Sequence, residues 1–264
     1  MKNPSRRSLL SGAGLLAGTA FLPTTALAAA DQPLRTLKPG QLRIGTYFVN
    51  PPFEFIDGGR RVGFEVDLMN AIAQRSGLRP VFINTRWEII LREMTERRYD
   101  CIIGGITITP DRRRILDWST PYLTTTLSLI VNAARANLTG LSDLKSETVG
   151  VQAATTDYDA AVALQRQGAI AGIKVYAFAR LPDAIKDLAA GRIGAVMKVR
   201  PVAEWSVRTT PGLRILCQVP DDPQPLGIGF AKRNGGLMDA INRALTAVQQ
   251  ESSYGEMLKR WNIA

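Results

Sequence analysis

The sequence predicts an α/β protein in which short strands alternate with amphipathic helices along most of the chain. Apolar runs of roughly four to eight residues, the length of strands, recur between longer segments whose apolar residues follow helical spacing. This alternation is typical of βαβ units, in which helices cover the faces of a sheet. The chain has 264 residues, of which 45% are hydrophobic and 21% charged, so it has an ordinary globular composition and room for one large domain or two smaller ones.

Strands are expected where a short apolar run lies between turn-forming residues. In chain order they are 42–47, 80–84, 100–105, 126–132, 148–152, 173–177, 194–198, 213–217 and 227–232. Helices are expected where apolar residues recur at helical spacing. They are 64–76, 87–97, 156–167, 181–190, 200–208, 236–250 and 253–261. The core-facing residues of the first helix and of the helix over 236–250 are expected to be Val66, Met69, Ala73, Met238, Ile241, Leu245 and Val248.

The first 28 residues have the features of an export signal. A basic start is followed by a short apolar core and by small residues at Ala26 and Ala28, which predicts cleavage after Ala28. Arg6 and Arg7 indicate the twin-arginine route, and an ordinary secretory signal is the alternative. The segment contains no cysteine for a lipid anchor, so a freely diffusing periplasmic protein is expected.

Charge and composition exclude several classes of function. The formal net charge is +10, but no basic segment is interleaved with aromatic residues, so a nucleic-acid partner is not expected. The arginine pairs at 60/61 and 97/98 are expected to lie on a solvated surface. The chain has no histidine, which removes the Ser-His-Asp and Cys-His arrangements and the commonest metal ligand. No metal, no other cofactor and no membrane-spanning segment are predicted.

The segment GGITITPDRRRILDWSTPY, residues 104–122, indicates a binding site for a carboxylate. A guanidinium such as that of Arg112 can make two parallel charge-assisted hydrogen bonds to a carboxylate. The hydroxyls of Thr107 and Thr109 can add further donors. The segment supplies no nucleophile, so it predicts binding rather than catalysis.

This segment and five others resemble the family 3 extracellular solute-binding proteins of polar amino-acid ABC transporters. The other five are LRIGTYFVNPPFEF (42–55), VGFEVDLMNAIA (62–73), RYDCIIGG (98–105), VGVQAATT (149–156) and LPDAIKDLAAGRIGAV (181–196). The resemblance runs from about residue 40 to the C-terminus. It implies a two-lobe periplasmic-binding-protein fold of type II, in which two crossing hinge segments join the lobes.

The resemblance also supplies the domain boundaries and the partners. It implies that residues 38–126 and 227–264 form lobe 1 and that residues 127–226 form lobe 2. The expected function is that of a monomeric substrate-binding component of an ABC uptake transporter, which captures an amino acid or related small carboxylate by lobe closure. The expected partner is an ABC permease in the inner membrane. Cys101 and Cys217 would then lie in core strands of different lobes and remain free, buried thiols.

Family members place ligand contacts at positions that can be matched here one by one. Arg112 corresponds to the arginine that binds the ligand carboxylate, with Thr107 as a hydroxyl donor and Gly105 as a backbone contact. Thr156 corresponds to the residue that grips the same carboxylate from lobe 2. It also begins a sequence that resembles a capping box with Asp159. Trp87 corresponds to the aromatic residue that packs against the ligand side chain.

Three positions depart from the family pattern. Asn50 and Tyr47 replace the usual aromatic residue and an aspartate, so neither supplies a carboxylate for a basic ligand side chain. Val199 replaces the aspartate that pairs with the ligand's α-ammonium. Strand alternation is expected to direct Lys198 and Val199 to opposite faces.

Three explanations of Val199 stay open. In the first, the ligand lacks the amine, and Lys198 or Arg200 assists if local twist turns one of them inward. In the second, Asp157 or another acid binds the amine. In the third, the alignment with the family is locally shifted.

Two other functions remain as alternatives. Periplasmic cyclohexadienyl dehydratases share this fold, but the position of their catalytic glutamate is Val202 here, and Glu204 lies two residues further along a helix. The second alternative is a ligand-sensing domain that contacts a membrane receptor. The prediction is therefore a binding protein rather than an enzyme.

Overall fold

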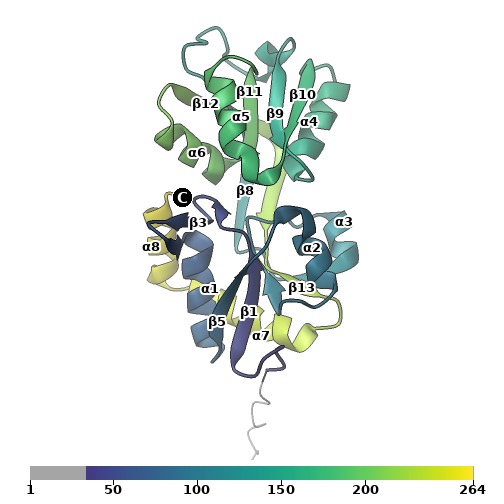
Figure 1. The fold of residues 1–264 in the computed structure, drawn as a ribbon, viewed down its shortest axis with the longest axis vertical. Coiled ribbons are helices and arrows are strands. Elements are labelled where there is room, and N and C mark those ends of the chain that lie inside the picture. Colours follow the sequence, from purple (N-terminus) through teal and green to yellow (C-terminus); the bar gives the residue numbers. More distant parts are fainter. Residues whose placement is uncertain (1–33, 264) are drawn as a thin grey trace, which may run out of the picture. The chain divides into compact units, whose positions relative to one another are not determined.

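The computed structural model describes residues 34–263, and the predicted export signal over 1–28 lies outside them. All strands of the described residues belong to two five-stranded sheets and one three-stranded sheet (Figure 1). Each of the two larger sheets combines parallel and antiparallel strands and is covered by helices. The protein is therefore a mixed α/β protein with two sheet-containing lobes, as predicted.

The first sheet has the strand order β5-β1-β6-β13-β7. Its strands are β1 (Gln41–Thr46), β5 (Arg79–Asn84), β6 (Cys101–Ile102), β7 (Leu116–Trp118) and β13 (Gly229–Ala231). Strand β1 pairs in parallel with both β5 and β6, whereas β13 runs antiparallel to β6 and β7.

The second sheet has the strand order β10-β9-β11-β8-β12. Its strands are β8 (Leu123–Asn132), β9 (Thr148–Gln152), β10 (Gly172–Tyr176), β11 (Ala195–Val199) and β12 (Leu213–Leu226). Strand β9 pairs in parallel with β10 and β11, whereas β8 runs antiparallel to β11 and β12. Each sheet therefore has three parallel strands that end at one common edge.

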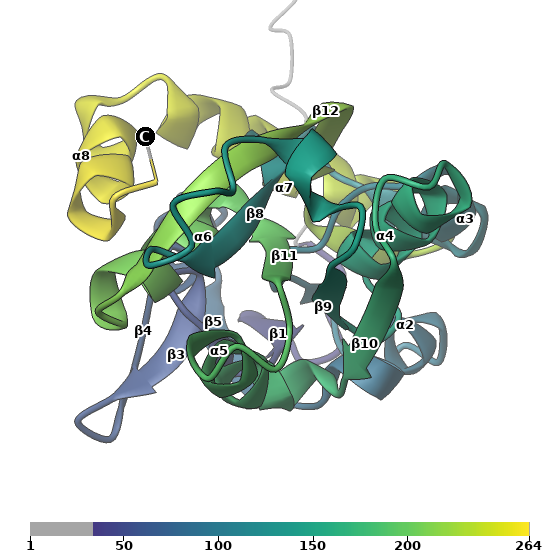
Figure 2. The same ribbon diagram turned by 90° about the horizontal axis from the view of Figure 1, so that it is seen from above.

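Amphipathic helices cover both sheets. They are α1 (Phe64–Arg75), α2 (Trp87–Thr95), α3 (Pro110–Ile115), α4 (Thr156–Arg166), α5 (Leu181–Ala189), α6 (Arg200–Thr209), α7 (Gly235–Gln249) and α8 (Ser252–Trp261). Two short 3₁₀ helices, η1 (Leu141–Leu144) and η2 (Phe178–Arg180), complete the set. Helix α1 packs against α7 and α8, and Figure 2 shows α4, α5 and α6 around the second sheet.

Long strands β8 and β12 form a two-stranded ribbon between the lobes (Figure 1). The sequence predicted β12 only over 213–217, but the strand continues to Leu226, with register shifts after Ile215 and Gln218. The prolines at 220, 223 and 225 hid this continuation. Proline is tolerated there because β12 lies at the edge of its sheet, where a missing N–H breaks no inner ladder.

Four strands and one α-helix were missing from the predicted set: the small sheet of β2 (Val49–Asn50), β3 (Glu54–Asp57) and β4 (Arg60–Val62), together with β7 and α3. The strand predicted over 100–105 is present but is only two residues long, as β6. These elements are too short to show a period in the sequence. The chain between β6 and α3 is held instead by an isolated bridge from Thr107 to Leu226.

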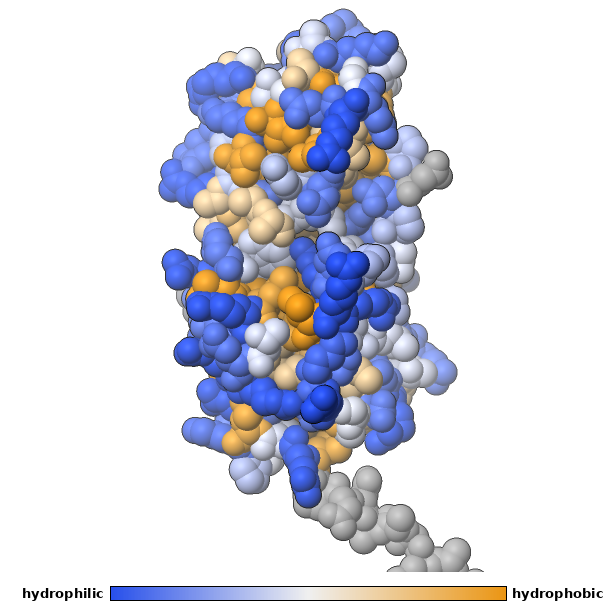
Figure 3. All heavy atoms as spheres, turned by 90° about the vertical axis from the view of Figure 1, so that its right-hand side faces the viewer, coloured by the Kyte–Doolittle hydropathy of each residue, from blue (hydrophilic) through white to orange (hydrophobic). Residues whose placement is uncertain are grey.

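The core contains the helix faces that the sequence predicted. All seven predicted core-facing residues of α1 and α7 are buried except Met238, which is half-buried. The arginine pairs at 60/61 and 97/98 are exposed, as expected. Figure 3 shows hydrophilic residues over much of one face, with apolar residues gathered in patches between them. Among the described residues, no helix combines the length and the apolar character that crossing a membrane requires.

Both cysteines of the described chain are free thiols, and they lie in different sheets. Cys101 in β6 is buried, and burial raises the pKa of its thiol. Cys217 in β12 is only half-buried, so the prediction of two buried thiols was wrong for this residue. The cause is again the position of β12 at the edge of the sheet, where one side of the strand lacks a neighbour.

The junction between β4 and α1 requires glycine at position 63. Gly63 has φ 135°, and a Cβ atom there would lie 2.1 Å from the carbonyl oxygen of Phe53. The amide of Glu65 donates to that same oxygen at 2.9 Å, so the backbone cannot move away without losing this bond. The start of α1 is therefore locked against the segment that leads into β3.

Replacing Gly63 with alanine is expected to destabilise the fold by about 2–4 kcal/mol, because it combines left-handed strain with overlap against the backbone. Urea unfolding followed by circular dichroism measures the effect. Gly58→Ala is the matched control, since Gly58 also has positive φ but nothing lies within 4 Å of its added Cβ. A loss of about 1 kcal/mol is expected there. Equal losses in the two variants would contradict the argument.

Two buried carboxyl groups, Glu54 of β3 and Glu65 of α1, lie beside each other. Burial raises the pKa of Glu54 well above its usual range, and the neighbouring charge of Glu65 raises it further. Burial also raises the pKa of Glu65, although hydrogen bonds from Tyr122 and from the Gly105 amide favour its charged form. Glu54 is therefore the member that stays protonated.

This raised pKa makes stability depend on pH in a definite direction. The stabilisation from protonated Glu54 is fully present below the unfolded pKa of about 4.3 and is lost as the pH rises through the folded pKa. The unchanged protein therefore loses this stabilisation as the pH rises, whereas the Glu54→Gln variant, which has no carboxyl group there, does not. The unfolding free energy of the variant minus that of the unchanged protein is expected to rise between pH 5 and pH 8 by on the order of 1 kcal/mol or more. Urea unfolding at both pH values measures this. Glu88→Gln, at an exposed position, is the control, and a difference independent of pH would refute the assignment.

Candidate functional site

A pocket lies where the carboxyl ends of the parallel strands of both sheets meet. In α/β proteins this edge is the usual place for a ligand, because the loops that follow the strands converge there. The pocket has a volume of about 30 Å³. The residues that line it are Tyr47, Asn50, Trp87, Gly104, Gly105, Thr107, Arg112, Thr155, Thr156, Asp157, Phe178, Lys198 and Val199.

All seven residues that the sequence proposed as ligand contacts line this one pocket. They come from both lobes and are Asn50, Trp87, Gly105, Thr107, Arg112, Thr156 and Val199. Thr109, proposed as an additional donor, does not line it. Its hydroxyl instead accepts a hydrogen bond from the Arg112 amide at 3.2 Å and caps α3. The competing demand of the helix start explains this difference.

The guanidinium of Arg112 spans the two lobes. One nitrogen donates to the carbonyl oxygen of Thr107 at 2.8 Å and the other to the carbonyl oxygen of Ala154 at 3.4 Å. The guanidinium carbon lies 5.0 Å from the centre of the Trp87 ring, within cation–π range. Burial lowers the pKa of Arg112, but an arginine remains charged at any physiological pH. The pocket therefore contains a partly desolvated, permanent positive charge.

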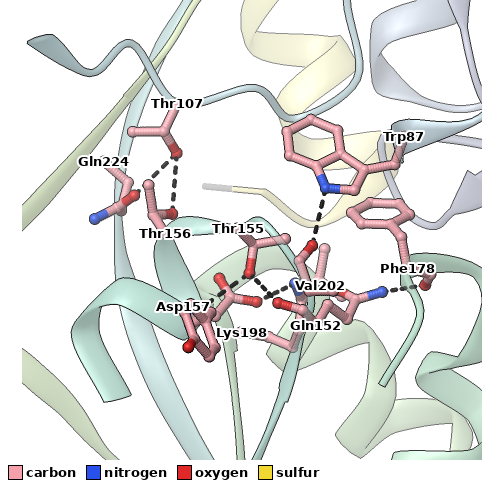
Figure 4. A network of polar contacts seen from close by, with 12 residues as sticks. Trp87, Thr107, Gln152, Thr155, Thr156, Asp157, Phe178, Lys198, Val202 and Gln224 are labelled. Atoms are coloured by element: carbon pink, nitrogen blue, oxygen red, sulfur yellow. Dashed lines mark hydrogen bonds and ion pairs between the residues drawn. The ribbon is translucent and has the colours of Figure 1, made fainter. Parts of the chain in front are cut away.

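Two threonine hydroxyls meet across the pocket wall (Figure 4). The hydroxyl of Thr107 donates to Oε1 of Gln224 at 2.9 Å and lies 3.4 Å from the hydroxyl of Thr156. The predicted capping residue of α4 was wrong by one position. Thr155 is the N-cap, and its hydroxyl accepts from the Tyr158 amide. The hydroxyl of Thr156, in the first helical turn, is thereby left to face Thr107.

Three aromatic rings form one side of the pocket. Trp87 and Phe178 are stacked with ring centres 5.3 Å apart, and the edge of Tyr47 meets both. The indole N–H of Trp87 donates to the carbonyl oxygen of Ala153 at 3.0 Å, which links α2 to the loop after β9 (Figure 4). All three rings are buried. Trp87 therefore acts both as a core residue and as part of the pocket wall.

Glycines 104 and 105 bring the backbone close to the pocket. A Cβ at Gly104 would lie 2.6 Å from the Tyr47 ring, and Gly105 has φ 61°. The amide of Gly105 donates to Glu65 at 2.7 Å, and Asn50 lies beside the same glycine. The Gly105 amide is therefore held by the buried carboxylate beneath the pocket.

A buried lysine is the largest difference from the sequence prediction. Lys198 and Val199 both line the pocket, although strand alternation predicted opposite faces. Val199 is the last residue of β11 and also the N-cap of α6, with φ −53° and ψ 140°, so the alternation of an extended strand ends there. The ammonium of Lys198 donates to Asp157 and to Gln152, each at 2.5 Å (Figure 4).

The sequence prediction missed Phe178, Gln152 and Gln224. It considered Lys198 only as an assisting residue, whereas the structure places it in the pocket lining. A usable signal existed for most of them, because Phe178, Gln152 and Lys198 each lie at or just after the end of a strand with a parallel partner. A lysine inside an apolar strand also requires a buried partner. Gln224 gave no such signal, since its neighbouring prolines made the segment read as a loop.

The positions considered for a catalytic acid lie outside the pocket lining. Val202 is buried in α6, and Glu204 is tied to Arg200 at 2.7 Å outside the pocket lining. Within residues 34–263, no three side chains of the metal-binding types His, Cys, Asp and Glu converge.

Comparisons with known proteins agree with this architecture. The profile of the bacterial extracellular solute-binding proteins, family 3, matches residues 42–264. The ABC transporter arginine-binding protein 1 of Escherichia coli K12 is 28% identical over 226 residues, which cover 84% of this chain and 90% of the relative. The L-cystine-binding protein TcyJ of the same organism is 28% identical over 224 residues, with 84% and 82% covered.

A solved structure extends the similarity to three dimensions. An ancestral arginine-binding protein bound to arginine is 30% identical, has a TM-score of 0.77, and is matched over 99% of its length and 86% of this chain. The profile match spans nearly all the described residues, including both sheets and every residue that lines the pocket. The chain therefore belongs to family 3 of the bacterial extracellular solute-binding proteins.

Proposed function

We propose that the protein is the periplasmic substrate-binding component of an ABC uptake transporter and that it captures an amino acid or related small carboxylate in the pocket around Arg112. The convergence on one pocket of the seven residues that the family resemblance indicated carries this proposal. Relatives whose names record arginine and cystine binding support the class of ligand. An ABC permease is the partner that this role requires.

The proposed mechanism is closure of the two lobes around the ligand. The pocket of about 30 Å³ holds roughly one or two water molecules, so a solute of amino-acid size enters only when the lobes move apart. Trp87 and Arg112 donate to the loop after β9, and Thr107 meets Thr156 at the start of α4; these contacts would break on opening and return on closure. The hinge would be the β8–β12 ribbon.

The lobe boundaries that the resemblance implied are kept as part of this proposal. Residues 38–126 and 227–264 would form lobe 1, and residues 127–226 would form lobe 2. The pairing of Leu123 with Leu226 places the two crossing segments side by side, which supports these boundaries. The protein would act as a monomer, because both halves of the pocket come from one chain.

A binding role is preferred to a dehydratase role. A catalytic acid would have to reach the pocket from α6, but the corresponding position is Val202 and Glu204 is paired with Arg200. The only carboxylate among the described residues that line the pocket is Asp157, and it is paired with Lys198.

Removing the guanidinium with Arg112→Ala is expected to weaken ligand binding by about 2–5 kcal/mol while leaving the fold intact, because a desolvated charge pair is lost. Calorimetry measures the affinity for the best ligand from a screen of amino acids, 2-oxo acids and dicarboxylates. Arg113→Ala is the matched control, since the neighbouring Arg113 is exposed and outside the pocket lining. Unchanged affinity in Arg112→Ala would refute the carboxylate assignment.

Trp87→Phe tests the contact between the lobes, because it keeps an aromatic ring but removes the N–H that donates to Ala153. Affinity is expected to fall about fivefold, the equivalent of one hydrogen bond of about 1 kcal/mol. Trp118→Phe is the control, since the indole nitrogen of Trp118 has no hydrogen-bond partner in the described part of the chain. Calorimetric titration measures the ligand affinity of both variants. Equal affinities for Trp87→Phe and Trp118→Phe would show that the Trp87 contact does not stabilise the closed form.

A further inference from the structure

The charged groups that line the pocket do not suit an amino-acid zwitterion. Among the described residues that line it, the charged side chains are Arg112, Lys198 and Asp157. Lys198 and Asp157 are 4% and 1% exposed, and they form an ion pair at 2.5 Å. These two charges compensate each other, so the charge of Arg112 remains for the ligand. The pocket as a whole therefore has an excess of one positive charge.

The Lys198–Asp157 pair is fixed in place by its neighbours. The side-chain amide of Gln152 donates to the carbonyl oxygen of Phe178, which turns its own oxygen toward Lys198. The ammonium of Lys198 thus has two oxygen partners and lies 5.9 Å from the centre of the Phe178 ring. An ammonium has three donors, so Lys198 keeps one donor for a further acceptor.

Three backbone acceptors around the pocket are already in use. The carbonyl oxygens of Ala153 and Ala154 accept from Trp87 and Arg112, and that of Gly104 accepts from the Tyr47 hydroxyl. Asp157 could receive a ligand ammonium only by sharing its carboxylate with Lys198. A second ammonium would then lie close to the first, and like charges repel strongly where water is excluded. Apart from the side-chain oxygen of Asn50 and the shared carboxylate of Asp157, the site offers a ligand mainly donors.

We propose that the pocket takes small amine-free acids, in which an oxygen stands where an α-amino acid carries its ammonium. This inference rests on the proposed function and names its ligand class. Arg112 receives the carboxylate, and the remaining donor of Lys198 receives a second oxygen, either the 2-oxo or 2-hydroxy group or a second carboxylate. The hydroxyl of Thr156 lies on the same wall as a further donor, whereas that of Thr107 already donates to Gln224. Such an anion matches both the excess positive charge and the excess of donors.

The experiment compares acids that share a carbon skeleton. Calorimetry on the full protein, unfolded and refolded to remove bound solute, measures L-glutamate against 2-oxoglutarate, L-alanine against pyruvate, L-phenylalanine against phenylpyruvate, and L-aspartate against succinate, with L-arginine and L-cystine added. The expected result is that at least one amine-free acid binds ten or more times as tightly as its amino-acid counterpart. Tighter binding by an amino acid overturns this inference and leaves the proposed function in place. Absence of binding by every acid in the set overturns the proposed function itself.

A pair of double variants tests the role of Lys198. Lys198→Met combined with Asp157→Asn removes both charges together, so no unpaired charge is left buried. The preference for the amine-free acid is expected to fall by at least tenfold. Lys174→Met combined with Asp187→Asn is the matched control, because this second lysine–aspartate pair lies in the same lobe outside the pocket lining. If the first double variant keeps the preference, with melting curves showing both variants folded, the inference is overturned.

Discussion

The antiparallel pairing of β8 with β12 is the constraint on which the site depends. This ribbon crosses between the lobes, and each lobe then builds its sheet with three parallel strands whose carboxyl ends reach the same pocket. Parallel strands place their following loops at one edge, so residues far apart in the chain converge without any local motif. Trp87 and Lys198, for example, come from α2 and β11. Binding chemistry here is therefore a consequence of strand direction.

A buried ion pair such as Lys198–Asp157 adds little net stability, because removing two charges from water costs about as much as their attraction returns. Its position between an aromatic ring and a glutamine amide instead fixes the direction of each donor. The buried carboxylate of Glu65 likewise fixes an orientation, because it accepts a hydrogen bond from the Gly105 amide. The polar groups of this pocket are arranged for orientation, and the stability of the fold comes from the apolar cores of the two sheets.

Long, periodic elements were predictable from the sequence and short ones were not. The helices from α4 to α8 and the inner strands β1, β9 and β11 lie within one or two residues of their predicted limits. Their apolar spacing repeats often enough to be read. The strands β2, β3, β4 and β7 have two to four residues each and exist because of their partners. The length of β12 was hidden by prolines that only an edge position allows.

The sequence by itself determined the α/β class, the family, and the seven residues that the fold brings to one pocket. Apolar spacing indicated the class, whereas the family and the site positions came from the resemblance that six ordered segments carry. Only the tertiary structure decided that Lys198 faces inward, that Asp157 is its partner, and that Thr155 rather than Thr156 caps α4. The direction of Lys198 depends on where β11 stops and α6 begins, and its partner comes from α4, 41 positions away in the chain. Such pairings depend on packing between elements, which no local pattern encodes.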